Sequence, residues 1–305
     1  FIIAPDESST LLIVDLTDGT MARFLRVKDR MPHISGEVID YIHDLVGLWV
    51  TPMGWGMMYF FVPIILRRPI WSHALSLVGF WGLAFIYPLQ GVHHFLGSPI
   101  PMFAQYSAVI STIAIEIVVT TVVINFFMTW KGTDGSLKRS IPIRWFWLGA
   151  LNYFITCFQC AVQVTLTFQN IIHFTDWVVA HAHLVMFGVF SFWIFGMIEH
   201  LWPKLTGNEW WSGGLRRWNF WLTTLGLGTM FLTLTAGGLI EGFMSMGLTP
   251  RETILTSLRP FWIVRTISGV GIIGGFTCLA INMVMTARGG SVAHVDTDYS
   301  PYEQN

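Results

Sequence analysis

The stretch Trp177-Val-Val-Ala-His-Ala-His-Leu184 places two histidines two residues apart near the start of a long apolar segment. Residues i and i+2 of a helix project about 200° apart, so His181 and His183 face opposite sides. One helix can therefore offer an imidazole nitrogen to each of two neighbours, and two flat cofactors flanking the helix would use that geometry. For an isolated pair, two buried and hydrogen-bonded histidines are the simpler interpretation, but this pair is accompanied by others.

The composition is that of an integral membrane protein. Of the 305 residues, 53% are hydrophobic and only 11% are charged, against roughly a quarter charged in soluble domains. Runs of about twenty apolar residues recur, and each is long enough to cross a hydrocarbon core of about 30 Å. The formal net charge of −1 and the lack of a basic block give no indication of nucleic-acid binding. Membrane lipid is the expected surrounding.

We expect an all-α, polytopic transmembrane bundle over residues 37–288. A polar extramembrane segment, residues 1–36 with a turn at Asp18-Gly19, precedes it, and a polar tail, residues 289–305, follows. The first residue is Phe, so the chain is expected to be a processed or partial portion of a longer polypeptide. The predicted spans are about 39–66, 72–96, 103–130, 143–168, 177–203, 218–245 and 261–287.

The distribution of Lys and Arg predicts the orientation of the spans. Ten basic residues follow the first, third, fifth and seventh spans, whereas the loops of the opposite side hold only Arg251 and Arg259. Four more in the N-terminal segment reduce the contrast to ten against six. Because cytoplasmic loops are enriched in basic residues, the first group of loops is placed in the cytoplasm.

Five histidines from three spans are predicted to lie at one depth, in the outer third of the membrane. His43 opens the first span, His93 and His94 end the second, and His181 and His183 open the fifth. Ionisable residues inside the apolar slab cost a few kcal/mol and usually mark a functional site. The sequence therefore predicts a site at the outer end of these three spans.

Neutral imidazole is a good ligand for copper, iron and zinc. His93 and His94 diverge by about 100° on a regular helix, so both reach one ion only where the helix is distorted. Gly91 and Gly97 permit such a distortion, and His43 would add a third nitrogen. A histidine-only metal site beside a haem, inside a membrane, suits the reduction of a small gas molecule.

At these residues the chain resembles the catalytic subunit, subunit I, of the haem-copper oxidase superfamily. The resemblance covers about residues 37–287, corresponding to the family's sixth to twelfth helices, and is greatest to the C-type, or cbb-type, cytochrome c oxidases, with nitric oxide reductases as near relatives. The motifs are IHDLVG at 42–47, Tyr87 before His93-His94, HFTDW at 173–177, HAH at 181–183, WPKL at 202–205 and IVR at 263–265.

The resemblance implies a role for each histidine of the predicted site. His43, His93 and His94 match the ligands of the copper called CuB. His181 matches the ligand of the high-spin haem that faces this copper, and His183 matches one axial ligand of the low-spin haem. Both haems are expected to be of the b type.

Tyr87 and Gly47 favour an oxidase over a nitric oxide reductase. Tyr87 matches the tyrosine that C-type oxidases link covalently to the first copper histidine, here His43, and a redox-active phenol can supply an electron and a proton to dioxygen. Nitric oxide reductases tend to carry a glutamate at the position of Gly47, where it helps bind a non-haem iron. The absence of that hard carboxylate here favours copper.

The resemblance also has departures. Gln159 stands where both branches carry a membrane glutamate, and residues 184–189 are somewhat closer to the reductases. The second ligand of the low-spin haem belongs to an early helix of the family. We therefore expect the remaining subunit I helices on a separate chain or in a missing N-terminal portion.

Further residues are candidates for supporting roles. The resemblance suggests that His173, Asp176 and Arg265 lie near the haems and their propionates. The proton-path candidates are Glu116, Gln159 and Thr156, of which Glu116 equally fits a satisfied interhelical hydrogen bond. Cys157 and Cys160 form a CxxC pair whose apolar flanks favour packing over metal or redox use.

We therefore expect a terminal oxidase subunit of the respiratory chain in a bacterial inner membrane, with its active site toward the outer side. It would reduce dioxygen to water with electrons from c-type cytochrome subunits and protons from the cytoplasm. The alternatives are a nitric oxide reductase-like subunit with non-haem iron and a non-catalytic haem-binding membrane subunit.

Overall fold

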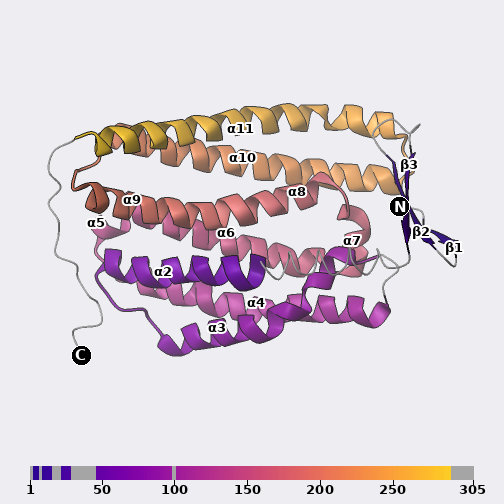
Figure 1. The fold of residues 1–305 in the computed structure, drawn as a ribbon, viewed down its shortest axis with the longest axis horizontal. Coiled ribbons are helices and arrows are strands. Elements are labelled where there is room, and N and C mark those ends of the chain that lie inside the picture. Colours follow the sequence, from indigo (N-terminus) through magenta and orange to yellow (C-terminus); the bar gives the residue numbers. More distant parts are fainter. Residues whose placement is uncertain (1–2, 7–8, 16–21, 29–45, 98–100, 290–305) are drawn as a thin grey trace.

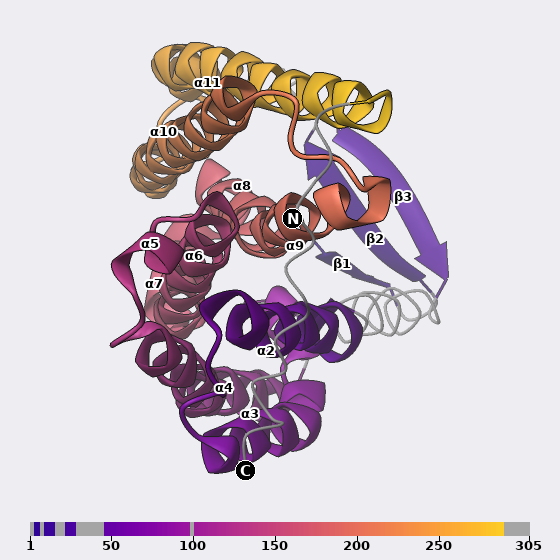
Figure 2. The same ribbon diagram turned by 90° about the vertical axis from the view of Figure 1, so that its left-hand side faces the viewer.

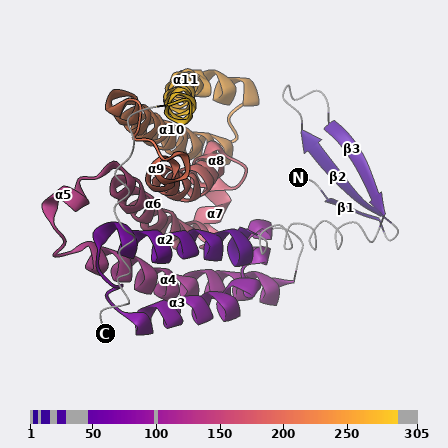
Figure 3. The same cartoon turned by 60° about the vertical axis from the view of Figure 1, so that its left-hand side comes forward.

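The computed structural model describes residues 3–6, 9–15, 22–28, 46–97 and 101–289. The N-terminal part of the chain contributes three strands, β1 (Ile3–Asp6), β2 (Ser9–Asp15) and β3 (Ala22–Lys28). They form an antiparallel sheet in the order β1-β2-β3, drawn at the N-terminal end of the ribbon (Figure 3). The turn predicted at Asp18-Gly19 lies outside the described residues.

The rest of the described chain is helical and holds seven segments long and apolar enough to cross a membrane, as predicted. The membrane part is therefore the all-α bundle expected, and the protein is an integral membrane protein. The segments are η1 (Val46–Val50) with α2 (Thr51–Leu66); α3 (His73–Ile86) with η2 (Tyr87–Leu89) and η3 (Gly91–Phe95); α4 (Met102–Trp130); α6 (Ile141–Gln163); α8 (Asp176–His183) with η4 (Leu184–Ser191) and α9 (Phe192–Thr206); α10 (Gly213–Met246); and α11 (Arg251–Ala287). Two short helices, α5 (Gly135–Lys138) and α7 (Leu166–Ile172), lie between them.

Two predicted boundaries differ from the structure. The fourth span ends at Gln163 and the chain restarts as α7, whereas the sequence predicted one span to residue 168. The last helix begins at Arg251, ten residues before the predicted start at 261. Its 37 residues correspond to about 55 Å, which exceeds the roughly 30 Å hydrocarbon core. The polar first turns of α11 are helical without being apolar, so a search for apolar runs does not detect them.

The helices form three groups that lie side by side (Figures 1 and 2). Helices α2, α3 and α4 make one group, α6 with α8 and α9 lies in the middle, and α10 and α11 make the third. One buried cluster joins the first group to the middle through residues such as Trp55 and Trp193. A second cluster joins the middle to α10, where the fully buried Trp145 ring lies 4.8 Å from the rings of both Phe192 and Phe220.

A hydrogen-bonded latch closes the α3–α4 hairpin at its open end, where the start of α3 meets the end of α4. The Asn125 side chain accepts from the Ser72 N–H at 2.8 Å and donates to the Ser72 carbonyl at 2.8 Å. One turn later, the Thr129 hydroxyl accepts from the Trp71 N–H at 2.9 Å. The Ser72 hydroxyl in turn caps the first turn of α3. Two buried side chains thus provide acceptors for the N–H groups of Trp71 and Ser72, and Asn125 adds a donor to the Ser72 carbonyl, which also accepts from the Ser76 N–H.

The same latch recurs in the α10–α11 hairpin. Asn282 accepts from the Ser212 N–H at 2.9 Å and donates to the Ser212 carbonyl at 3.0 Å. Thr286 accepts from the Trp211 N–H at 3.0 Å. Both latches use Trp-Ser before one helix and Asn-x-x-x-Thr near the end of the next, so the two hairpins are structural repeats.

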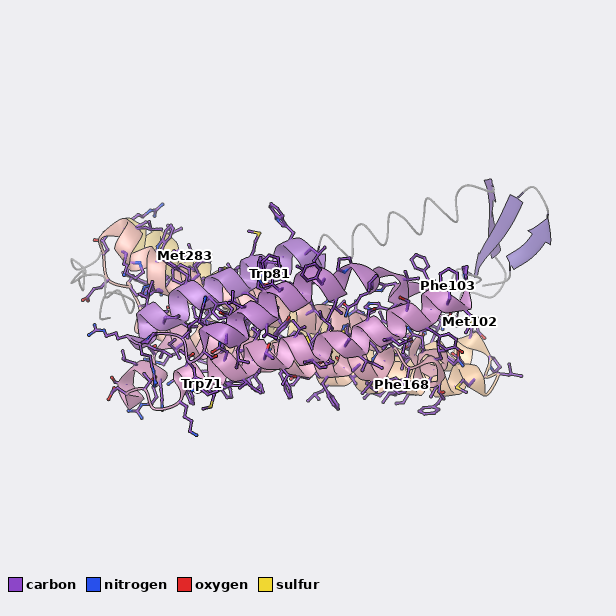
Figure 4. The ribbon with its side chains drawn as sticks, turned by 90° about the horizontal axis from the view of Figure 1, so that it is seen from below. Trp71, Trp81, Met102, Phe103, Phe168 and Met283 are labelled. Atoms are coloured by element: carbon purple, nitrogen blue, oxygen red, sulfur yellow. The ribbon has the colours of Figure 1, made fainter. Side chains whose placement is uncertain are left out.

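The outer surface of the bundle is apolar. Trp81 is 55% exposed and Phe103 is 77% exposed, and Figure 4 shows Trp71 and Met283 toward one end and Phe103 and Phe168 toward the other. Such a surface would promote association in water, whereas a bilayer covers it.

Candidate metal centre

Four of the predicted site histidines, His93, His94, His181 and His183, lie in the described chain. His94 lies within electrostatic range of both His181 and His173. The histidines at the end of the second span and at the start of the fifth are therefore close enough to influence each other's charge. His43 lies outside the described residues.

The second span is distorted at its histidine pair, as its glycines predicted. Helix α3 ends at Ile86 and the chain continues as two 3₁₀ turns, with Pro88 opening η2. The tighter winding brings the His93 and His94 rings to a centroid distance of 4.5 Å. Both imidazoles can consequently approach one point.

The Thr112 hydroxyl of α4 determines the tautomer of His93. Its oxygen lies 3.0 Å from His93 Nδ1 and donates its own proton to the Ala108 carbonyl at 2.6 Å. Because that proton is already used, the hydroxyl accepts the Nδ1–H of His93. The lone pair of the imidazole is then on Nε2, the arrangement of a metal ligand held by an outer hydrogen bond.

His181 is oriented in the same way from α6. Its Nδ1 lies 3.1 Å from Gln159 Oε1, a carbonyl oxygen that can only accept. Its Nε2 therefore carries the lone pair, and the Cys160 sulfur lies 3.4 Å from that nitrogen. Gln159, a proton-path candidate in the sequence, thus contacts Nδ1 of His181. Cys160, expected to serve in packing, contacts Nε2 of the same ring.

His183 faces the other side of α8, as the two-residue spacing predicted. Its Nδ1 donates to the Val179 carbonyl at 2.8 Å and the residue is exposed, so its Nε2 also carries the lone pair. The π-helical segment η4 begins at the next residue. Short π-helical segments occur frequently at functional sites because they change which face a helix presents.

The donor chemistry of these imidazoles fits copper and haem iron. Three of them have Nδ1 bonded to an oxygen acceptor and Nε2 as the basic nitrogen, which is the ligand form. Within the described part of the chain, no group of three or more His, Cys, Asp or Glu side chains could hold a metal. A three-histidine copper set therefore depends on His43.

The Tyr87 ring lies directly on Gly47. A Cβ at position 47 would be 1.8 Å from two of the ring carbons, so residue 47 must lack a side chain while the ring is there. Tyr153 of α6, which is 6% exposed, lies within electrostatic range of Tyr87. The phenol of Tyr87 thus lies between the first span and the middle of the bundle.

Glu116 of α4 lies near Tyr153, Cys157 and Cys160, within electrostatic range of each. Its Oε1 is buried and has no hydrogen-bond partner among the described residues. The Thr156 hydroxyl oxygen, one helical turn from Cys160, is in the same condition. Two of the three proton-path candidates therefore have buried polar atoms that water or a moving proton could serve.

The elbow between α7 and α8 holds His173 and Asp176. His173 stacks on Phe174 with a centroid distance of 3.9 Å. Burial lowers the pKa of the His173 imidazole, and its hydrogen bond to the Leu96 backbone opposes this shift. Asp176 Oδ2 accepts from the Trp262 indole at 2.7 Å. The third predicted cofactor contact, Arg265, lies exposed on α11.

Sequence reasoning missed Tyr153 and Cys160. Both lie on the apolar helix α6, where nothing in the spacing distinguishes the face toward the histidines from the others. No spacing signal was available, because the contact between Cys160 and His181 depends on how α6 is rotated relative to α8.

Three comparisons with known proteins bear on this site. Residues 39–271 match the family model "Cytochrome C and Quinol oxidase polypeptide I". A cytochrome c oxidase subunit 1 homolog of Agrobacterium tumefaciens (strain T37) is 28% identical over 257 residues, covering 82% of this chain and 48% of the relative. The Cbb3-type cytochrome c oxidase subunit CcoN1 of Stutzerimonas stutzeri is 28% identical over 264 residues, covering 84% and 56%.

A solved heme-copper terminal oxidase dimer has a similar fold. The TM-score is 0.72 at 18% sequence identity, covering 84% of this chain and 49% of that one. The chain spans about half the length of the relatives it matches.

Proposed function

We propose that this chain, which belongs to the cytochrome c and quinol oxidase polypeptide I family, carries the oxygen-reducing centre of a C-type-like terminal oxidase. Its substrate is dioxygen, its product is water, and a c-type cytochrome supplies the electrons. The observation that carries the proposal is the Tyr87 ring seated on Gly47.

The proposed ligands are those that the family resemblance implies, and the nitrogen chemistry of the histidines is compatible with them. His93 and His94, with His43, hold CuB; His181 holds a high-spin haem and His183 a low-spin haem, both of the b type. When bound, the haem iron and the copper supply electrons for cleavage of the O–O bond. Thr112 and Gln159 hold His93 and His181 in the tautomers that this ligation requires.

Tyr87 and Gly47 support dioxygen over nitric oxide as the substrate. A glutamate at position 47 would help bind a non-haem iron, but the Tyr87 ring occupies the space into which any Cβ there would project. The phenol and that carboxylate are therefore mutually exclusive in this fold. Nitric oxide reduction is the second candidate, with iron in place of copper.

Proton delivery is proposed to run from Glu116 toward Tyr87. Glu116 Oε1, which has no hydrogen-bond partner among the described residues, lies in electrostatic range of the Tyr153 phenol. Tyr153 in turn lies in electrostatic range of Tyr87. Tyr87 can then donate a proton together with an electron, and Tyr153 lies where it could replace that proton. The Thr156 hydroxyl adds a polar atom on the same helix.

His183 and His181, two residues apart on the same helix, would hold the low-spin and the high-spin haem, and these haems would supply the electron route to the site. His173, Asp176 and Arg265 are proposed cofactor contacts on this outer side, of which Asp176 is already engaged by Trp262. The remaining subunit I helices, supplying the second ligand of the low-spin haem, and the c-type cytochrome subunits are the proposed protein partners.

The proposed location is the bacterial inner membrane, with the site toward the outer face. The concentration of Lys and Arg after the odd-numbered spans supports this orientation. The proposed division of the chain is an extramembrane segment at 1–36, a catalytic bundle at 37–288 and a polar tail at 289–305.

Metal content and turnover of the purified complex test the proposal. Copper together with haem, and oxygen consumption, support the oxidase; iron without copper, and nitric oxide turnover, support the reductase. Haem alone without turnover of either gas supports a non-catalytic subunit. His181→Ala should remove the high-spin haem signal, and an unchanged optical spectrum would refute the assignment of that ligand.

A further inference from the structure

Glu241 is a buried carboxylate of α10 that contacts the start of α8. The residue is 6% exposed. Its Oε2 accepts from the backbone N–H of Asp176 at 3.0 Å, and its Oε1 pairs with Arg251 Nη1 at 3.1 Å. A side chain from a helix distant in sequence thus satisfies the first N–H of the helix that carries both axial histidines.

Two glycines on either side of Glu241 bring the backbones of α10 and the α7–α8 elbow into contact. A Cβ at Gly238 would lie 2.0 Å from the Trp177 nitrogen, and one at Gly242 would lie 2.1 Å from the Ile171 carbonyl oxygen. Neither position could carry a side chain without moving the elbow. The close backbone contact between α10 and the α7–α8 elbow therefore fixes the position of Glu241 next to the Asp176 N–H.

The interaction matches what a helix start requires. The first N–H groups of a helix have no partners within it and carry partial positive charge, so an anion there is stabilising. Thr175 caps the Trp177 N–H, and Glu241 takes that of Asp176. The Arg251 guanidinium balances the charge of the buried carboxylate.

The elbow itself is held in an unfavourable backbone conformation. Phe174 has φ of 63°, a region that residues other than glycine rarely adopt and that persists only when the surroundings enforce it. Asp176 adds a second tie, because its Oδ2 accepts from the Trp262 indole of α11 at 2.7 Å. The start of α8 is thus fixed on the α10–α11 hairpin from two sides.

We propose that Glu241, with Arg251 as its counter-charge, is a positioning residue for His181 and His183. It fixes the tilt and the rotation of the first turns of α8, from which the two imidazoles project to opposite sides. His181 lies five residues after Asp176, about 7.5 Å along the helix, so a shift of the first turn reaches both ligands. That the imidazoles bind haem iron rests on the proposed function; the anchoring of α8 does not.

Three variants of the purified complex test this role. Glu241→Ala removes the acceptor, Glu241→Gln keeps an amide oxygen that can accept from Asp176 but loses the charge, and Glu252→Ala is the control on a neighbouring exposed site. Hydrogen exchange of peptides covering residues 171–183 measures the anchoring. The g-values of the oxidised low-spin haem measure the orientation of its axial ligand.

In Glu241→Ala we expect exchange at residues 176–183 to accelerate at least about tenfold, the change that 1.4 kcal/mol produces, and the g-values to shift. Glu241→Gln should fall between this variant and wild type, and Glu252→Ala should match wild type. If Glu241→Ala does not fold, Arg251→Met, which removes only the counter-charge, should give the intermediate change.

Wild-type exchange and wild-type g-values in Glu241→Ala, or in both Glu241→Gln and Arg251→Met, would overturn the proposal. Absence of haem from the wild-type complex would overturn the proposed function instead. The exchange comparison would still decide whether Glu241 anchors α8.

Discussion

Replacing Thr112 by Val tests whether its hydroxyl fixes His93 as a metal ligand. Valine has nearly the same shape but lacks the oxygen that lies 3.0 Å from His93 Nδ1. His93 is 7% exposed, so water does not readily replace this partner, and an unsatisfied buried donor costs about 1–3 kcal/mol. Loss of such an outer partner lowers metal affinity by roughly 10- to 100-fold, or about 1.4–2.8 kcal/mol. The two ranges agree.

The assay is the retention of copper by the purified complex during titration with a competing chelator. Thr121→Val is the matched control, because its hydroxyl donates to the Val118 carbonyl on the same helix at 2.7 Å. We expect Thr112→Val to release copper at roughly 10- to 100-fold lower chelator activity, and the control to behave as wild type. Equal retention by Thr112→Val and wild type would refute the tautomer argument.

Three further predictions concern the two latches, Gly47 and His173. Asn125→Ala and Asn282→Ala each remove the acceptor of a serine N–H, whereas the carbonyl of the same serine keeps its helical partner. Both variants should therefore lose about 1–3 kcal/mol of unfolding free energy in detergent, and unequal losses would contradict the structural repeat. Gly47→Ala should displace the Tyr87 ring and lower oxygen consumption while haem content stays constant; normal turnover would contradict the proposed role of the phenol. Because burial lowers the pKa of His173 in the folded state, protonation opposes folding and the free energy of unfolding falls as the pH drops below about 6.5. His173→Gln should flatten this pH dependence. The same pH dependence of the unfolding free energy in His173→Gln and wild type would rule out this contribution of His173.

The sequence was sufficient for the bundle because membrane spans are defined by length and apolarity. It failed where a helix is polar or where an apolar run changes direction. Arg251 and Arg259 suggested a loop, yet they lie in α11 beyond the apolar run. The break after Gln163 has no proline or glycine to mark it; the short helix α7 that follows the break contacts α10 through Ile171 and Gly242.

For the site, the positions of the histidines along the spans predicted their depth in the membrane. These positions did not predict how each helix is rotated about its own axis. The histidine pairs could be placed at one level because each lies at the end of a span, and the distortion at His93 could be expected from its glycines. Which face of α6 points toward His181 depends on packing between helices, so the contact with Cys160 had no counterpart in the spacing. The same holds for Glu241, whose partner is a backbone N–H.

The two latched hairpins differ chiefly at the end of the first helix that lies opposite the latch. In one copy, α10 runs unbroken from Gly213 to Met246, whereas in the other, α3 stops at Ile86 and unwinds into the turns that carry the histidine pair. The same latch is therefore compatible with two different far ends, a continuous helix or a pair of tight turns, so the latch and the histidine corner are separate features of a hairpin. Grafting the 87–95 sequence into α10 would be a direct way to build a second corner that carries a histidine pair.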